Sequence, residues 1–284
     1  MKKNKGTLLV FLAAVLFSMG GLLVKIIPWT AMPLNGARCL VSVCVLAVYM
    51  KLTRHKLVIN KAVLLGAVCS FGTNILYTIA NKMTTAANTI VLQFTAPVFI
   101  ILFMWLFFNE KPRKLDVIAC FFVFSGIVCF FIDGISAGNI VGNVLALMSG
   151  VTYAGVFMMN TFRGSDPLSS VIIGHSMGAV IGLPFIAQQT EFTMPIIGGI
   201  LILGMFQMAL AYIFLTNGLL STPPVTASLV TGIEPILNPV LVAVFYHEFI
   251  GAVSVIGAVI VVGTILIYDV IKGRTDPGRG DNYE

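Results

Sequence analysis

The chain has little charge. Only 10% of its 284 residues are Asp, Glu, Lys or Arg, whereas 58% are hydrophobic. A soluble globular domain has about 25% charged residues covering its surface, and a disordered chain combines low hydrophobicity with high charge. Both classes are therefore excluded. The composition indicates a protein whose surroundings are lipid.

Signatures of catalysis and of metal binding are missing too. The sequence has no G-x-G-x-x-G, P-loop, H-E-x-x-H or G-x-S-x-G motif. Its five cysteines lie in apolar runs, and none has the C-x-x-C spacing of a zinc or redox site. We therefore expect no enzyme, no cofactor and no metal. The net charge of +6 reflects orientation in a membrane rather than nucleic-acid binding.

Long apolar runs, each able to cross a bilayer, fill almost the whole sequence. They occupy residues 7–27, 33–51, 62–80, 85–108, 115–132, 139–161, 167–187, 194–215, 223–246 and 250–271. The predicted fold class is an all-α integral membrane protein with ten transmembrane helices. The glycine- and proline-containing segment 272–284 is predicted to be a disordered tail.

The distribution of Lys and Arg predicts the orientation, because cytoplasmic loops collect these residues. With the N-terminus inside, 14 of the 17 lie on the cytoplasmic side, and Lys25, Arg38 and Lys82 lie toward the outer side. We expect a multi-pass protein of the cytoplasmic membrane with both termini in the cytoplasm.

An internal repeat relates the two halves of the chain. Pro97 precedes Glu110 by 13 residues near the end of one apolar run, and Pro235 precedes Glu248 by the same 13 residues, at an offset of 138. Each half holds five helices, an odd number, so the second half enters the membrane from the opposite side. The sequence thus predicts two inverted five-helix repeats that move about a central site, with Pro97 and Pro235 as hinges.

These paired Pro-x12-Glu helices and the small-residue first helix of each half resemble the drug/metabolite transporter superfamily, specifically its ten-helix members with two EamA-type domains. The resemblance places the domains at residues 6–135 and 139–271. It implies two inverted bundles around a cavity, and many members of the family export amino acids or other small metabolites. Two departures stand out: Phe17-Ser18 replaces a frequent Trp-Gly or Trp-Ala pair, and Glu234 precedes Pro235.

Glu234 is the sharpest candidate for function. It lies about 11 residues into a run of 24, and a carboxylate at the bilayer centre costs roughly 2.5–3.5 kcal/mol on insertion scales. It is interpreted as a proton-coupling or cation-binding group. The structural alternative is an acid satisfied by backbone groups freed near Pro235 and Pro239.

Three other ionisable residues leave alternatives open. Arg38 and Lys25 either snorkel to the headgroups or bind a substrate carboxylate, and snorkelling is favoured for Lys25. His175 lies in the middle of the seventh run, where it either shuttles protons as a coupling residue or is a neutral ring bonded to a neighbouring helix.

Uncharged polar residues inside the runs complete the predicted substrate site. Asn74 and Tyr77 are three residues apart, and Glu234 and Asn238 are four apart, so each pair shares a helix face. The alternative role for such side chains is to bond helices together. The predicted substrate-binding residues are Glu234, Asn238, Gln93, Asn74, Tyr77, Arg38, Tyr153, Gln207 and Tyr212.

The sequence therefore predicts a secondary-active transporter of small polar metabolites in the lipid bilayer, an exporter of amino-acid-like or amine solutes that works by alternating access, with protons as the candidate coupling ion. A facilitator or importer of a neutral or cationic solute, such as a nucleobase, sugar or quaternary amine, is the alternative. An intramembrane enzyme accounts for Glu234 but lacks a second catalytic partner at fixed spacing.

Overall fold

The computed structural model describes residues 2–130, 132, 139–237 and 252–275, and within these residues the regular secondary structure is helical. The first repeat contains α1 (Lys2–Phe17), α2 (Gly20–Ile26), α3 (Ala31–Thr53), α4 (Lys61–Met83), α5 (Ala86–Gln93), α6 (Ala96–Phe108) and α7 (Lys114–Phe130). The second contains α8 (Ile140–Phe157), η2 (Met159–Thr161), α9 (Pro167–Ile186), α10 (Met194–Ile202), η3 (Leu203–Leu210), α11 (Ala211–Leu219), α12 (Pro224–Val230), η4 (Thr231–Ile233) and α14 (Ala252–Thr275).

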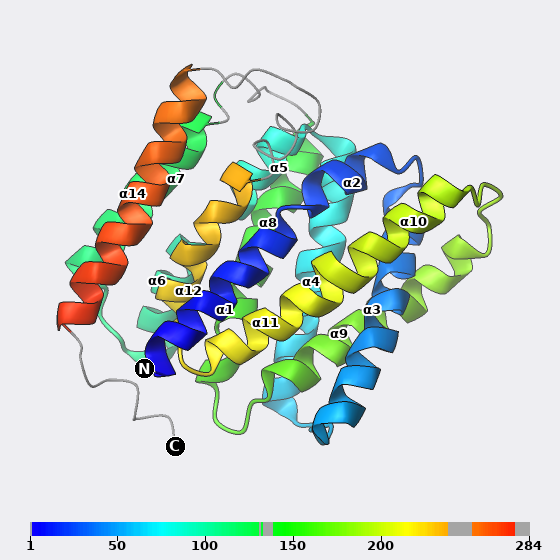
Figure 1. Ribbon diagram of the computed structural model, residues 1–284, viewed down its shortest axis with the longest axis horizontal. Helices are drawn as coiled ribbons and strands as arrows, with labels where there is room; N and C mark the ends of the chain where they lie inside the picture. The colour runs from blue at the N-terminus through cyan, green and yellow to red at the C-terminus, as the bar shows by residue number, and fades with distance from the viewer. Residues whose placement is uncertain (1, 131, 133–138, 238–251, 276–284) are drawn as a thin grey trace.

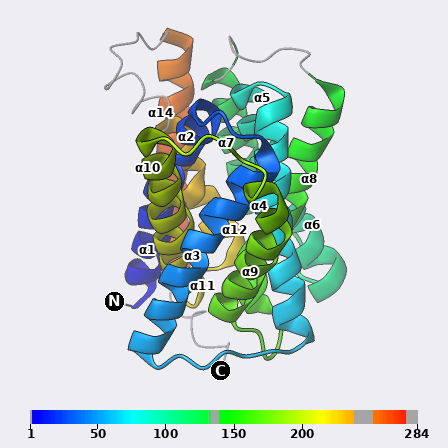
Figure 2. The ribbon, with the colours of Figure 1, turned by 90° about the vertical axis from the view of Figure 1, so that its right-hand side faces the viewer.

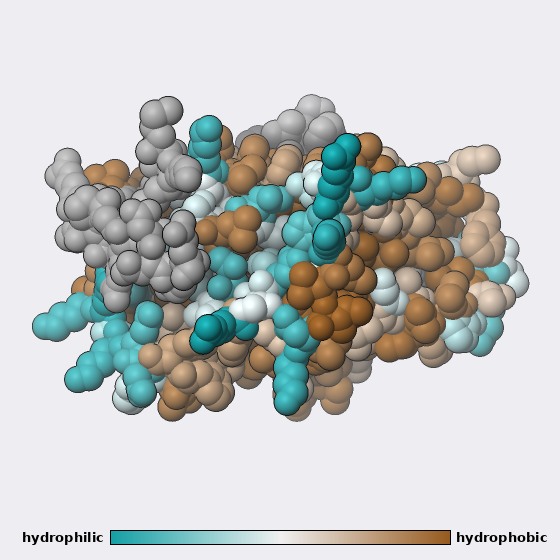
Figure 3. All heavy atoms as spheres, turned by 90° about the horizontal axis from the view of Figure 1, so that it is seen from below, coloured by the Kyte–Doolittle hydropathy of each residue, from teal (hydrophilic) through white to brown (hydrophobic). Residues whose placement is uncertain are grey.

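Six helical segments among the described residues are long and apolar enough to cross a membrane, and shorter apolar helices accompany them. Large hydrophobic side chains such as Leu65, Leu106 and Phe107 are exposed on these segments. Such an outer surface suits hydrocarbon rather than water. Seen from the end where α1 begins, hydrophilic residues gather on part of the face, and hydrophobic residues cover much of its margin (Figure 3).

The packing of the helices follows the repeat. α3 lies along α9, and α7 lies along α14, so each of these helices packs against its own counterpart in the other half (Figure 1). α1 packs against α11, and exchanging the two halves turns this pair into α8 against α4, which also pack together. A contact pattern that survives exchange of the halves is what a pseudo-two-fold axis produces.

The halves run in opposite directions. α1 begins and α14 ends at one end of the molecule (Figure 1), whereas α8 begins at the other end (Figure 2). α5 and α6 run toward the end where α1 begins, while α12 runs away from it (Figure 1). The two repeats are therefore inverted with respect to each other.

Several predicted continuous helices are interrupted. The first run breaks at Ser18 and Met19, between α1 and α2, and the fourth breaks at Phe94 and Thr95, between α5 and α6. The eighth contains the π-helical segment η3, and the ninth contains the 3₁₀ turn η4 just before Glu234. Hydropathy does not register such breaks, because the residues around them remain apolar.

The start of the predicted tail needs a correction. The sequence placed disorder from residue 272, but α14 continues to Thr275. A single glycine, Gly273, costs a helix only about 1 kcal/mol, and α14 packs along α7 over much of its length. The rest of the predicted tail lies outside the described residues.

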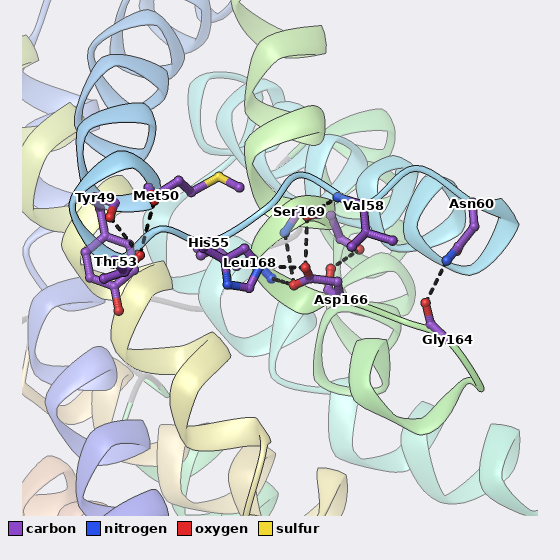
Figure 4. Close-up of polar contacts among 11 residues, drawn as sticks. Tyr49, Met50, Thr53, His55, Val58, Asn60, Gly164, Asp166, Leu168 and Ser169 are labelled. Carbon is purple, nitrogen blue, oxygen red and sulfur yellow. Dashed lines mark hydrogen bonds and ion pairs between the residues drawn. The ribbon is translucent and has the colours of Figure 1, made fainter. Parts of the chain in front are cut away.

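A polar contact joins two loops at one end. His55 Nε2 lies 2.6 Å from Asp166 Oδ2, and the Asp166 carboxylate also caps α9 by accepting from the backbone N–H groups of Leu168 and Ser169 (Figure 4). Asn60 caps α4 and donates its Nδ2 to the Gly164 carbonyl at 2.7 Å. The α3–α4 loop is thereby fastened to the start of α9.

At the opposite end, the α2–α3 and α9–α10 loops, which are the counterparts of these two loops in the repeat, also contact each other, through an aromatic side chain. Trp29, in the turn before α3, donates its indole N–H to the carbonyl oxygen of Glu191 at 3.1 Å. Its ring packs edge-on against Phe192 with 5.3 Å between centroids. Trp29 is 4% exposed, so the indole packs the turn before α3 against the α9–α10 connection.

Candidate functional site

A pocket lies between the two repeats, where the interrupted helices approach one another. It holds about 380 Å³ of space free of atoms, part of it open to the outside. Its described lining comprises Phe17, Gly20, Thr73, Asn74, Tyr77, Gln93, Tyr153, Gln207, Tyr212 and Glu234. Both halves contribute to this lining, as expected for a site at a repeat interface.

The break between α5 and α6 brings Gln93 to the pocket. Pro97 has no N–H to donate to the carbonyl oxygen of Gln93, four residues earlier. Next to this gap, Thr95 donates both its backbone N–H and its side-chain hydroxyl to the carbonyl oxygen of Leu92. Gly150 of α8 allows this irregular backbone to approach, because an added Cβ there would lie 2.9 Å from the backbone carbonyl oxygen of Gln93.

The π-helical segment η3 carries Gln207. π-helical turns are rare and often occur at functional sites. Gln207 is 8% exposed, and its Oε1 is buried without a hydrogen-bond partner. Gly20 of α2 lies beside this side chain and makes room for it, since an added Cβ would lie 3.0 Å from Gln207 Nε2.

Glu234 follows the 3₁₀ turn η4 and precedes Pro235. Its Oε2 is buried and has no hydrogen-bond partner. At the offset of 138 the first repeat has Ala96, directly before Pro97. The two repeats thus differ at this point, and Glu234 is the carboxylate of the described pocket lining.

Asn74 and Tyr212 form a polar pair on the lining. Asn74 Nδ2 donates to the Ser70 carbonyl at 2.9 Å and to the Tyr212 hydroxyl at 3.2 Å. The Tyr212 ring packs edge-on against Phe17 with 5.1 Å between centroids. These contacts hold an amide, a hydroxyl and an aromatic ring in fixed positions beside the pocket.

His175 lies behind this pair and is fully buried. Its Nε2 is 3.4 Å from Asn74 Nδ2, which can only donate, so Nε2 accepts. A neutral ring with its proton on Nδ1, which lies 2.8 Å from Ser42 Oγ, fits both contacts. This arrangement fits the predicted alternative of a neutral histidine bonded to neighbouring helices.

Arg38 is also fully buried. Its Nη2 donates to Asn35 Oδ1, to the Asn74 carbonyl and to Thr78 Oγ1, while Nε and Nη1 have no partner. These contacts lie between α3 and α4, outside the described lining of the pocket. A snorkelling Arg38 does not fit them.

Seven of the nine predicted substrate-binding residues meet in this pocket, although the geometry does not test whether they bind a solute. Asn238 lies outside the described residues, and Arg38 and the coupling candidate His175 lie outside the lining. Phe17, Gly20 and Thr73 were not predicted. The repeat held a signal for Phe17, because it matches Tyr153 at an offset of 136.

An inverted-repeat helical membrane protein with a polar pocket at broken helices has the architecture of a transporter. The EamA-like transporter family matches residues 4–132 and again residues 140–268. The chain belongs to this family. The prediction of an all-α membrane protein built from two such repeats is confirmed, and the chain is a membrane transporter of small solutes.

The comparison with solved structures supports the fold. A structure described only as "Crystal structure of protein" superposes with a TM-score of 0.80, covering 96% of this chain and 99% of its own. The two sequences are 17% identical, so this likeness concerns the fold alone. No curated protein matches the sequence significantly.

Proposed function

We propose that the protein is a secondary-active exporter of small polar solutes, amino-acid-like or amine in chemistry, and that the pocket is its solute site. Glu234 carries this proposal, because a buried carboxylate oxygen without a partner is costly unless a ligand or a proton satisfies it. The direction of transport is supported by the resemblance to exporting members of the superfamily.

Alternating access would use the breaks beside the pocket. Pro97 follows the α5–α6 break and Pro235 follows η4, so both helices can bend where backbone hydrogen bonding is already interrupted. Rocking of one repeat against the other about these prolines would expose the pocket to each side in turn.

Glu234 is proposed as the coupling group. A carboxylate holds either a proton or a cationic solute, so binding of one displaces the other. A proton entering from outside would release a cation outward, and the carboxylate would bind the next cation when it faces the cytoplasm. His175 is a weaker candidate than Glu234 for the coupling group, because its two ring nitrogens already have hydrogen-bond partners in the protein.

Flux in proteoliposomes tests the proposal. The purified protein is reconstituted, and counterflow of labelled amines and amino acids is measured with and without an imposed pH gradient. We expect the gradient to accelerate uptake into vesicles with an acidic lumen. Equal rates with and without the gradient would refute proton coupling and favour the facilitator.

Glu234→Gln separates a coupling carboxylate from a structural one. Gln keeps the size and hydrogen bonding of the side chain but cannot titrate. We expect folded protein whose transport no longer responds to the pH gradient. Glu110→Gln is the matched control, because Glu110 is exposed at the end of α6. Unchanged, gradient-driven transport in Glu234→Gln would overturn the proposed role.

A further inference from the structure

Two hydrogen-bond acceptors in the pocket lack partners. They are Oε2 of Glu234 and Oε1 of Gln207, and both atoms are buried. Leaving a buried polar atom unpaired costs about 1–3 kcal/mol, and more when the group is charged. The pocket therefore favours a ligand that brings several donors.

The charges of the lining side chains also favour a cationic ligand. Among the described lining residues Glu234 carries an anionic side chain, and none carries a cationic one. Four of the ten are aromatic, and aromatic rings attract cations through their faces. A carboxylate placed here would meet a negative charge and find no cation to pair with.

Arg38 does not supply the missing cation. Its Nη2 is committed to three acceptors on α3 and α4, and the residue does not belong to the described lining. Asn74 Nδ2 likewise shares its two hydrogens among three acceptors, the Ser70 carbonyl, the Tyr212 hydroxyl and His175 Nε2. Asn74 thus has its donors bonded within the protein, and the unpaired Nε and Nη1 of Arg38 belong to a side chain outside the described lining.

We infer that the solute is a primary or secondary amine without a carboxylate, whose N–H groups bridge Glu234 Oε2 and Gln207 Oε1. An ammonium group has up to three N–H donors and can satisfy both acceptors at once. A quaternary ammonium carries the same charge but no donor, and a zwitterion adds a carboxylate without a partner. This inference rests on the proposed function and narrows it from polar metabolites to amines.

Binding to the purified protein in detergent tests the chemistry without a gradient. Four probes share one skeleton: phenethylamine, its trimethylammonium analogue, phenylalanine and 3-phenylpropionate, with a matching butyl series for a smaller pocket. We expect the primary amine to bind about tenfold or more tightly than the other three, by thermal shift and calorimetry. Tighter binding of an amino acid or of the quaternary cation, or no binding of any amine, would overturn the inference.

Gln207→Met tests the second acceptor. Met matches the length of Gln but offers no carbonyl oxygen, so the preference for the primary over the quaternary amine should fall to about twofold. Gln188→Met, at an exposed position beyond α9, is the control and should keep the full preference. An unchanged preference in Gln207→Met would remove Gln207 from the site. If this variant does not fold, the relative affinities of the wild-type protein for the four probes still test the inferred amine site.

Binding and flux separate this inference from the proposed function. Amine binding without flux in proteoliposomes would leave the amine site standing and overturn the transporter. Gradient-driven flux of amino acids with no amine binding would support the transporter and overturn the amine site.

Discussion

The contact between α3 and α9 offers a sharp test of the fold, because their backbones meet at two glycines. A Cβ added at Gly36 would lie 2.5 Å from the Cα of Gly182, and one added at Gly182 would lie 2.3 Å from the Cα of Gly36. Ordinary contact begins near 3.4 Å, so alanine at either position pushes the helices apart by about 1 Å. No flexible side chain is present to yield instead.

Overpacking costs about 1–3 kcal/mol, and a close approach of two backbones, with no side chain to yield, belongs to the upper part of that range, about 2–3 kcal/mol. The better helix propensity of alanine offsets about 1 kcal/mol of this cost. We therefore expect Gly36→Ala and Gly182→Ala each to lower the free energy of unfolding by about 1–2 kcal/mol. That corresponds to a fall of about 2–8 °C in the unfolding midpoint, measured in one detergent by size-exclusion after heating. The double variant should lose less than the two single losses together, because both remove the same close approach.

Gly198→Ala is the matched control. An added Cβ at Gly198 of α10 meets nothing within 4 Å, so this variant should keep or slightly raise the midpoint. Equal midpoints for Gly36→Ala, Gly182→Ala and Gly198→Ala would refute a backbone contact between α3 and α9.

Three further predictions follow from other contacts. Asp166→Ala removes the cap of α9 and the contact with His55, so the free energy of unfolding should fall by about 1–2 kcal/mol in thermal denaturation, and an unchanged midpoint would contradict the cap. Gly20→Ala displaces Gln207 by a few tenths of an ångström, so it should weaken amine binding in calorimetry while the midpoint stays near wild type; tight binding would show that Gln207 lies elsewhere. Arg38→Lys loses guanidinium contacts between α3 and α4, so it should lower the midpoint and leave the order of preference among solutes unchanged; a changed order at normal stability would place Arg38 in the pocket.

The helices and the repeat were predictable because composition and spacing encode them. A crossing needs a long apolar run, and the Pro-x12-Glu pairs recur at a fixed offset. Seven pocket residues were found by the same logic, because a polar side chain in an apolar run has to face another polar group or a cavity. Orientation and domain limits stay predictions.

The details of the site depend on distances that the sequence does not contain. Arg38 was expected near the outer side, yet its guanidinium turns inward because Asn35 and Thr78 offer acceptors there. Gln207 reaches the pocket through a π-helical segment that no apolar pattern marks. Gly20 was not predicted as a pocket residue, and its place beside Gln207 is visible only when α2 is packed against η3.

The difference between Ala96 and Glu234 at equivalent positions has an electrical consequence. One carboxylate neutralises one positive charge at a time, so a cycle that swaps one proton for one monovalent ammonium moves no net charge across the bilayer. The voltage across the membrane then neither drives nor opposes the exchange, and the difference in pH alone sets how far the amine is concentrated. A second carboxylate in place of Ala96 would double the charge that the pocket accommodates and make the cycle sensitive to voltage whenever the total charge carried inward differs from that carried outward, as when two protons exchange for one monovalent ammonium.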